Sequence, residues 1–510
     1  MFGKFLVASM TFCLLVLVSI PAIAVSPAVV FEQIYDRGVE DVGYYATPTR
    51  DGGYIITGCT KDSSGSANKL DILTVKTDCS GDTVWTRTYY AYDGTYDDRS
   101  YCVQQTREGG YIIAGYVLYA PIWVPGWSRG YLVKINEVGD IVWTHIFPDS
   151  EMVACRSIQE IKNGGYGYIV TGQAKRGIGK GDLSVIRIDA EGNPLWICYF
   201  DNAQLPDGGS WVEETSDGNF IVVGTTASSL VGFNYDYDVC LIKINANGSI
   251  LWSRTYGETG KDGGSFVQQT SDGGYGIVGS TEVVADNEDI YFIKTDGDGN
   301  ILWKRNYGGP EHEQGYSFRQ LSDNGYLIVG WTASFSSTGQ DLYVLRTDSL
   351  GNFIWDRVLD GKGDYALGYS ITKADSGCYV IAGRTTNPAT GGVDVYFIKM
   401  KIEDLTGVPD EESPYSLPQQ FALSQNYPNP FNSSTTVNFD IAKSGEVKLE
   451  IFNALGQKVR TLVNQWMSPG SYHLNWDGRD EKGDSVASGV YFCKVQTEES
   501  SQTKKMLLLK

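Results

Sequence analysis

The sequence predicts an all-β protein in which repeated four-stranded sheets form a ring and a small β-sandwich follows. Three observations predict this fold class. Short alternating apolar runs separated by glycine turns recur along most of the chain. Glycine (60) and tyrosine (33) are abundant among the 510 residues, which is typical of many short strands joined by tight turns. Runs of apolar residues at helical spacing are hard to find.

The best-formed unit covers residues 264–308 and contains four runs with strand character, at 265–270, 275–280, 290–295 and 301–307. Asp272-Gly273-Gly274 separates the first two runs, and the glycines can take the positive φ that a hairpin turn needs. Residues 296–300 (DGDGN) form a slightly longer turn between the last two. The unit therefore predicts an antiparallel meander of four strands.

This unit recurs along the chain. The first hairpin turn appears seven times, at residues 51–54, 108–111, 163–166, 217–220, 272–275, 323–326 and 375–378. A tryptophan marks the fourth strand in six copies, and its flat ring suits packing between neighbouring sheets. These structural tryptophans are Trp85, Trp143, Trp196, Trp252, Trp303 and Trp355.

The seventh copy has a third strand at 394–400 but no convincing fourth strand. Residues 30–35 precede the first copy and match the register of the fourth strand at 302–307. We therefore expect the N-terminal strand to complete the last sheet, which predicts a seven-bladed β-propeller over residues 25–402. An open solenoid is the alternative, and it would not need a fourth strand at the start.

The first 24 residues predict a secretory signal peptide. Lys4 precedes an apolar stretch, and Ala22-Ile23-Ala24 is a cleavage site of the A-x-A type. The alternative is an uncleaved anchor. No other stretch is long and apolar enough to span a bilayer, so we expect a mature chain without a transmembrane segment.

The net charge of −20 argues against nucleic acid or an anionic membrane surface as a partner.

The turn Asp296-x-x-Gly299-x-x-x-Trp303, which also occurs at 189–196 and 348–355, resembles the blade motif of quinoprotein-like and WD-like β-propellers. Quinoprotein dehydrogenases usually have eight blades and a vicinal disulfide in the site. This chain has seven copies of the unit and no adjacent cysteines. We therefore expect no cofactor.

Residues 403–420 are charged and proline-rich, as in a linker, and residues 421–510 predict a small antiparallel sandwich. The motifs at residues 426–432 (NYPNPFN), 455–457 (LGQ), 476–480 (WDGRD), 487–491 (ASGVY) and 504–506 (KKM) occur in it in order. With these motifs the sandwich resembles the C-terminal sorting domain of type IX secretion cargo, which looks like the immunoglobulin-like domain of the flagellar hook-capping protein. The resemblance implies export across a Gram-negative outer membrane by the type IX machinery, with secretion or cell-surface attachment. An accessory sandwich without a sorting role is the alternative. The sorting motif residues are Tyr427, Pro428, Asn429, Pro430, Phe431, Lys504 and Lys505.

Aromatic residues in loops that depart from the repeat predict a binding site for a glycan or a protein on the rim of the ring. The alternative is that the tryptophans plug the central channel or pack a long loop onto its neighbour. The candidates are Tyr119, Trp123, Trp127, Phe233, Tyr235, Tyr237, Trp331 and Phe335.

The sequence shows no recognisable set of catalytic residues. The chain has three histidines and no arrangement of Ser, His and Asp that indicates a nucleophile, so we expect a binding or scaffold protein rather than an enzyme. A polysaccharide lyase or hydrolase using rim carboxylates is the alternative, and a structural surface protein is a third possibility. Asp296, Asp298 and Asn300 have the spacing that begins a calcium loop, but a hairpin turn explains them, and we expect no metal site.

Overall fold

A computed structural model describes most of the chain beyond residue 26. The described residues are 27–61, 69–91, 96–119, 128–163, 165–175, 181–202, 205–231, 234–257, 260–284, 287–336, 339–361, 363, 365–375, 377–402, 421–426, 429–432, 434–441, 445–467, 470–497 and 500–509. They form strands and turns, and they include no helix with the length and hydropathy of a membrane span. The predicted signal peptide (1–24) and linker (403–420) lie outside them. The prediction of an all-β chain is confirmed.

Five successive four-stranded sheets follow one another along the chain. Their strands are β6 (Asp98–Gln105), β7 (Tyr111–Leu118), β8 (Ser128–Ile135) and β9 (Ile141–Ile146); β10 (Ala154–Glu160), β11 (Tyr168–Lys175), β12 (Gly181–Ile188) and β13 (Pro194–Phe200); β14 (Asp207–Glu214), β15 (Phe220–Val231), β16 (Asn234–Ile244) and β17 (Ile250–Tyr256); β18 (Asp262–Gln269), β19 (Tyr275–Val284), β20 (Asn287–Thr295) and β21 (Ile301–Tyr307); β22 (Glu313–Gln320), β23 (Tyr326–Thr332), β24 (Asp341–Thr347) and β25 (Phe353–Leu359).

Two further four-stranded groups share one sheet, because a single parallel residue pair, Glu40 with Val393, joins them. One group is β2 (Glu40–Pro48), β3 (Tyr54–Lys61), β4 (Asp71–Thr77) and β5 (Thr83–Tyr89). The other is β26 (Ala366–Lys373), β27 (Cys378–Thr386), β28 (Val393–Lys401) and the N-terminal strand β1 (Ala28–Tyr35), which pairs antiparallel with β28. The sequence also predicts that the N-terminal strand lies beside the third strand of the last sheet, which is β28.

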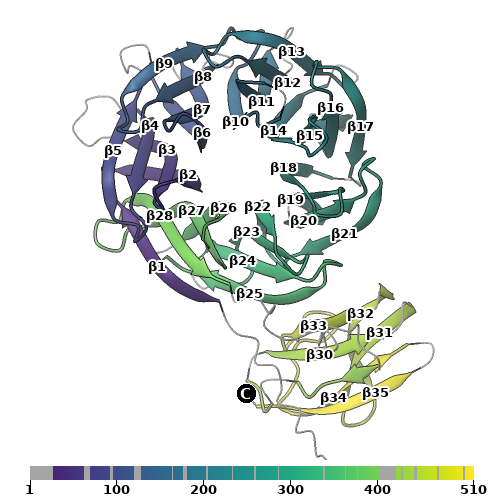
Figure 1. The fold of residues 1–510 in the computed structure, drawn as a ribbon. Helices are drawn as coiled ribbons and strands as arrows, with labels where there is room; N and C mark the ends of the chain where they lie inside the picture. Colours follow the sequence, from purple (N-terminus) through teal and green to yellow (C-terminus); the bar gives the residue numbers. More distant parts are fainter. Residues whose placement is uncertain are drawn as a thin grey trace, which may run out of the picture.

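Figure 1 shows the sheets arranged in a ring, with the first strand of each sheet toward the centre and the fourth strand outside. Each first strand contacts the first strand of the next sheet, and β26 contacts β2. The inner strands β2, β6, β10, β14, β18, β22 and β26 therefore surround one central space.

The fourth-strand tryptophans pack against the turn of the following sheet. A Cβ placed on Gly299 would lie 2.9 Å from the Trp252 ring, and one on Gly351 would lie 2.6 Å from the Trp303 ring. Both glycines have positive φ, which glycine adopts without steric strain. Each position also requires glycine because a Cβ would collide with the neighbouring tryptophan ring. The same pairing joins Trp85 with Gly139, Trp143 with Gly192, and Trp196 with Gly248, while Trp355 packs against the core that contains Tyr379.

The N-terminal strand repeats this contact at the junction between the last and the first sheets. Phe31 takes the place of the tryptophan, and a Cβ on Gly81 would lie 3.0 Å from its ring. Tyr35 donates a hydrogen bond to the carbonyl of Gly81, as Tyr307 does to Gly351 at 2.6 Å. The ends of the ring thus meet through the same contacts that join neighbouring sheets elsewhere.

The turn at residues 296–300 is held by its own side chains. Asp296 Oδ1 accepts hydrogen bonds from the backbone N–H groups of Asp298 (2.9 Å) and Asn300 (2.8 Å), and its Oδ2 accepts from the Asn300 side chain at 2.9 Å. The spacing that resembles a calcium loop is therefore explained by hydrogen bonds that close a hairpin.

Carboxyl groups meet at several junctions between sheets. Asp98 at the start of β6 lies near Asp71 of β4, and burial, with a smaller contribution from the Asp71 charge, raises the pKa of Asp98 to about 8. Burial and the nearby charge of Glu313 raise the pKa of Asp289 to about 6. Such raised values mean that the folded protein holds protons which the unfolded chain has released.

We expect the stability of the ring to fall as the pH rises from about 4 to about 8. In this window folded Asp98 is still protonated, whereas the unfolded carboxyl, with a pKa of 3.8, has lost its proton. Asp98→Asn should flatten this slope and raise the melting temperature at pH 9, as measured by thermal unfolding over a pH series. Asp296→Asn, in an exposed turn, should leave the slope unchanged, and an unchanged slope in Asp98→Asn would contradict the assignment.

The C-terminal residues form two facing sheets of an Ig-like domain. One sheet contains β29 (Ala422–Leu423), β30 (Thr435–Ile441) and β33 (Gly470–Trp476); the other contains β31 (Gly445–Asn453), β32 (Lys458–Met467), β34 (Gly489–Gln496) and β35 (Ser501–Leu508). Fully buried Trp476 lies at the centre, with ring centroids 5.6 Å from Phe431 and 5.1 Å from Tyr491. The predicted small sandwich is confirmed.

Candidate functional site: the central cavity

A cavity of about 680 Å³ lies among the inner strands. Each inner strand has a register shift, a β-bulge, at the same position, and the extra residue lines the cavity. A bulge turns a side chain away from the regular alternation of the strand. In ring order these bulge residues are Tyr44, Tyr101, Arg156, Ser210, Ser265, Tyr316 and Tyr369.

The bulge residues are not alike around the ring. Tyrosine rings form a continuous arc, with centroid distances of 5.2 Å for Tyr316–Tyr369, 5.1 Å for Tyr369–Tyr44 and 5.1 Å for Tyr44–Tyr101. The guanidinium of Arg156 extends the arc at 4.3 Å from the Tyr101 ring. The smaller Ser210 and Ser265 occupy the remaining bulge positions, beside Trp211 and Phe266, which also line the cavity.

A second guanidinium joins the aromatic wall from β27. Arg384 lies 5.5 Å from the Tyr365 ring and 6.0 Å from the Tyr369 ring. Its buried Nε has no hydrogen-bond partner. Among the described residues that line the cavity, none is Asp, Glu or His. The cavity wall therefore carries two positive charges, Arg156 and Arg384, although the whole chain has a net charge of −20.

The hydroxyls of Tyr44, Tyr316 and Tyr369 stay protonated at neutral pH, because burial raises the pKa of each above its usual value. Neutral hydroxyls can donate hydrogen bonds as well as accept them. Tyr316 uses its hydroxyl to donate to Gln314 Oε1 at 2.8 Å. The wall thus combines apolar ring faces, hydroxyl groups and guanidinium donors.

None of the described rim aromatics predicted from the sequence lines the central cavity. Trp123, Trp127 and Phe233 fall outside the described residues. Tyr119 donates a hydrogen bond to Asp149 at 2.7 Å and stacks with Arg129 at 4.6 Å. This polar group lies at the ends of β7 and β8 and does not line the central cavity.

Of the other described candidates, none lines the cavity, although Trp331 hydrogen-bonds Tyr316 of its wall. Tyr235 and Tyr237 are neighbours on β16, with ring centroids 6.0 Å apart. Phe335 is 45% exposed and lies 5.6 Å from the Tyr343 ring. Trp331 was predicted on a rim loop, but it lies inside β23 and is only 8% exposed, because β23 extends one residue beyond it.

The described sorting motif residues are brought together by the last strand of the Ig-like domain. Asn429 donates from Nδ2 to the Lys505 carbonyl at 3.2 Å and accepts from the Leu507 N–H at 2.9 Å. The Phe431 N–H donates to the Leu507 carbonyl at 3.0 Å, and its side chain is buried. Lys504 and Lys505 lie on β35, whereas Tyr427 and Pro428 are not described.

Known structures resemble the whole chain only distantly. A protein of unknown function from Dyadobacter fermentans is 12% identical, with a TM-score of 0.44 over 74% of this chain and 99% of that one. PorZ, a surface component of the type-IX secretion system of Porphyromonas gingivalis, is 12% identical, with a TM-score of 0.29 over 94% of this chain and 75% of that one. The polysaccharide lyase Uly1 is 10% identical, with a TM-score of 0.48 over 72% and 92% of the two chains.

Comparison with curated protein sequences finds no match. The C-terminal part does match a family model. Residues 426–501 are similar to the FlgD Ig-like domain, and the two facing sheets around Trp476 are the structure of that segment.

Proposed function

We propose that the protein is a binding module that holds an acidic glycan in the central cavity. The observation that carries this proposal is the tyrosine arc with Arg156 and Arg384 beside it, in a cavity whose described lining residues include no carboxylate. Flat aromatic faces stack on the apolar faces of sugar rings. Guanidinium groups bind carboxylates or sulfates through paired hydrogen bonds.

The cavity supports binding better than glycan cleavage by paired carboxylates. Hydrolysis of this kind needs two acids across one bond, and the described lining residues include none. The volume of about 680 Å³ lies within the usual range of small-ligand sites. The cavity would then take a short segment or an end of an acidic polysaccharide.

Replacement of Arg384 by alanine should weaken binding of a polyuronate oligosaccharide by about 10- to 100-fold, since a charge-assisted hydrogen bond is lost. Tyr369→Ser should weaken it by about tenfold, and serine already occupies the equivalent bulge at Ser210 and Ser265, so the fold should tolerate it. Titration calorimetry with polyuronate, sulfated and neutral oligosaccharides measures both effects.

Arg254→Ala is the matched control, because Arg254 stacks at 5.5 Å on Trp252 of the outer strand β17. It should leave the affinity unchanged. Equal affinity for neutral and acidic oligosaccharides, or an equal loss in Arg254→Ala and Arg384→Ala, would reject the proposal. Binding of sulfated but not carboxylated sugars would identify the anion.

We infer that the ring has seven blades. The sequence repeat, the order of inner strands and the pairing of β1 with β28 support this count. Contacts of Phe31 and Tyr35 with Gly81 that match those of Trp303 and Tyr307 with Gly351 support completion of the last blade by the N-terminal strand.

We further propose that residues 1–24 are a signal peptide and that the Ig-like domain is a sorting domain for type IX secretion in a Gram-negative bacterium. The convergence of Asn429 and Phe431 on the strand that carries Lys504 and Lys505 supports one recognition surface. The mature protein would then be secreted or displayed on the cell surface.

In a host with type IX secretion, Lys504→Ala combined with Lys505→Ala should leave most of the protein in the periplasm. Immunoblots of periplasm, cell surface and medium measure the distribution. Lys458→Ala, also on the Ig-like domain but on β32, is the control and should be exported normally. Normal export of the double variant would argue for an accessory domain without a sorting role.

A further inference from the structure

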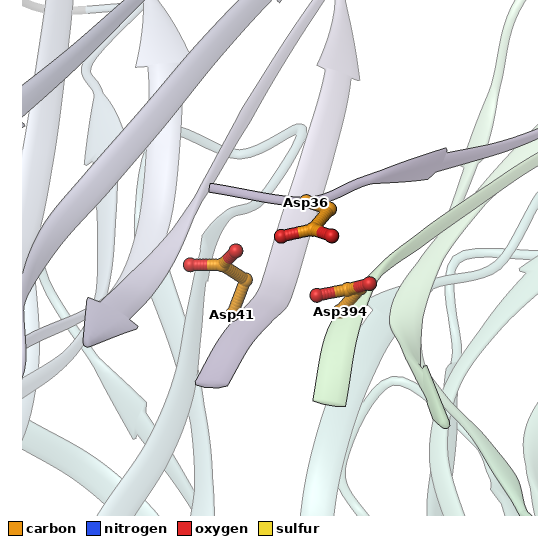
Figure 2. Close-up of side chains that lie close together, drawn as sticks. All are labelled: Asp36, Asp41 and Asp394. Atoms are coloured by element: carbon orange, nitrogen blue, oxygen red, sulfur yellow. The ribbon is translucent and has the colours of Figure 1, made fainter. Parts of the chain in front are cut away.

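Three aspartates meet where the two ends of the ring join. Asp36 follows β1, Asp41 lies in β2, and Asp394 lies in β28. Figure 2 shows that their side chains lie close together. One oxygen from each lies within 4.8 Å of the others. These residues come from both ends of the ring sequence, so only the folded ring creates the cluster.

Two of the three carboxylates are fully buried, and Asp394 has an oxygen without a partner. Asp41 and Asp394 are both 0% exposed, and the buried Oδ1 of Asp394 has no hydrogen-bond partner. Asp41 accepts from the N–H groups of Arg37 and Gly38 and from Thr60, whereas the Asn387 side chain donates to Asp394 Oδ2 and, at 3.4 Å, to Asp36 Oδ2. The protein thus orients these groups and leaves Asp394 Oδ1 available to a further ligand.

The cluster has no positive charge of its own. None of the ion pairs among the described residues involves Asp36, Asp41 or Asp394. Burial, the nearby charge of Asp36 and that of Asp41 raise the pKa of Asp394 to about 6. Buried like charges are costly unless protons or a cation compensate them.

We propose that Asp36, Asp41 and Asp394 bind one calcium ion. Calcium takes carboxylate oxygens at about 2.3–2.6 Å, so two oxygens on one ion can be separated by up to about 5 Å, and the three oxygens lie within 4.8 Å of one another. Exposed Asp36 leaves a path for the ion from solvent. Magnesium demands near-ideal octahedral geometry at about 2.0–2.1 Å, whereas calcium accepts variable ligand numbers and angles, which suits three carboxylates from separate strands.

The ion would hold the N-terminal strand to the last and first sheets. Its three ligands come from the end of β1, from β2 and from β28, and a ligand that binds only the folded chain stabilises it. The site is separate from the central cavity, whose lining contains none of these residues.

Thermal unfolding of the full chain in EDTA and with Ca²⁺ tests the proposal. Calcium at about 100 times its Kd should raise the melting temperature by about 3 °C. Asp394→Asn should abolish this increase, and in EDTA it should be at least as stable as the unaltered chain, because one buried charge is removed. Asp36→Asn, at an exposed position, should reduce the increase without a risk to folding.

Asp289→Asn is the matched control, since Asp289 meets only Glu313 at its junction. It should keep the full response to calcium, and titration calorimetry should show one calcium site lost in Asp394→Asn but not in Asp289→Asn. An equal calcium response in Asp394→Asn, or no response of the unaltered chain, would overturn the proposal. An equal or larger response to Mg²⁺ would overturn the assignment to calcium.

Discussion

Replacing Phe31 by alanine should lower the free energy of unfolding of the ring by about 3 kcal/mol. The Phe31 ring lies 5.5 Å from Phe397 of β28 and 6.1 Å from Tyr54 of β3, and it covers Gly81. It is the aromatic contact through which the N-terminal strand joins the last sheet to the first. Denaturant unfolding followed by tryptophan fluorescence measures the change.

Val30→Ala is the control in the same strand. Its side chain is 53% exposed, so its loss should change the stability by no more than about 0.5 kcal/mol. If both variants are equally stable, the N-terminal strand does not contribute to the ring. If Phe31→Ala produces a separate early transition, the junction opens before the remaining sheets unfold.

Gly299→Ala should destabilise the ring by about 1–3 kcal/mol more than Gly273→Ala. The two glycines have φ values of 79° and 83°, so alanine meets the same backbone strain of about 1–2 kcal/mol at both positions. A Cβ on Gly273 meets nothing within 4 Å, whereas a Cβ on Gly299 would lie 2.9 Å from Trp252 and 3.0 Å from Arg254. The difference measures the contact between neighbouring sheets.

Trp252→Ala provides the check on this comparison. In a Trp252→Ala background the extra cost of Gly299→Ala should shrink, because one of the two side chains that crowd the new Cβ is gone and only Arg254, at 3.0 Å, remains. The same denaturant unfolding measures the four variants of this cycle. An undiminished difference between the two glycine variants in that background would mean that the Trp252 contact is not its cause.

Much of the fold could be predicted because its signals are local. Turn glycines and alternating runs show where strands begin and end, and the repeated tryptophan shows which strand faces the next sheet. The pairing of the N-terminal strand with the last sheet could be predicted because residues 401–407 do not provide the fourth strand that the seventh copy needs. Trp331 was misplaced, since a boundary between strand and loop differs by one or two residues from the pattern.

The tyrosines that line the central cavity could not be identified from the sequence, because a β-bulge changes the direction in which each side chain leaves its strand. Tyr44, Tyr101, Tyr316 and Tyr369 each follow a small residue in an inner strand, and a bulge turns them toward the central cavity. The alternation of side chains between the two faces of a regular strand does not show where a bulge makes this change. Comparing the residue at this one position across the copies would have revealed the asymmetric arc of tyrosines and arginine.

The sequence by itself determined the class of fold and the repetition of four-stranded units, because these depend on residues close together in the chain. Only the tertiary structure decided which side chains meet. The tyrosine arc needs four inner strands brought around one axis. The cluster of Asp36, Asp41 and Asp394 needs the two ends of the ring to come together. Both sites depend on contacts between residues that are far apart in the sequence, and local sequence patterns do not predict such contacts.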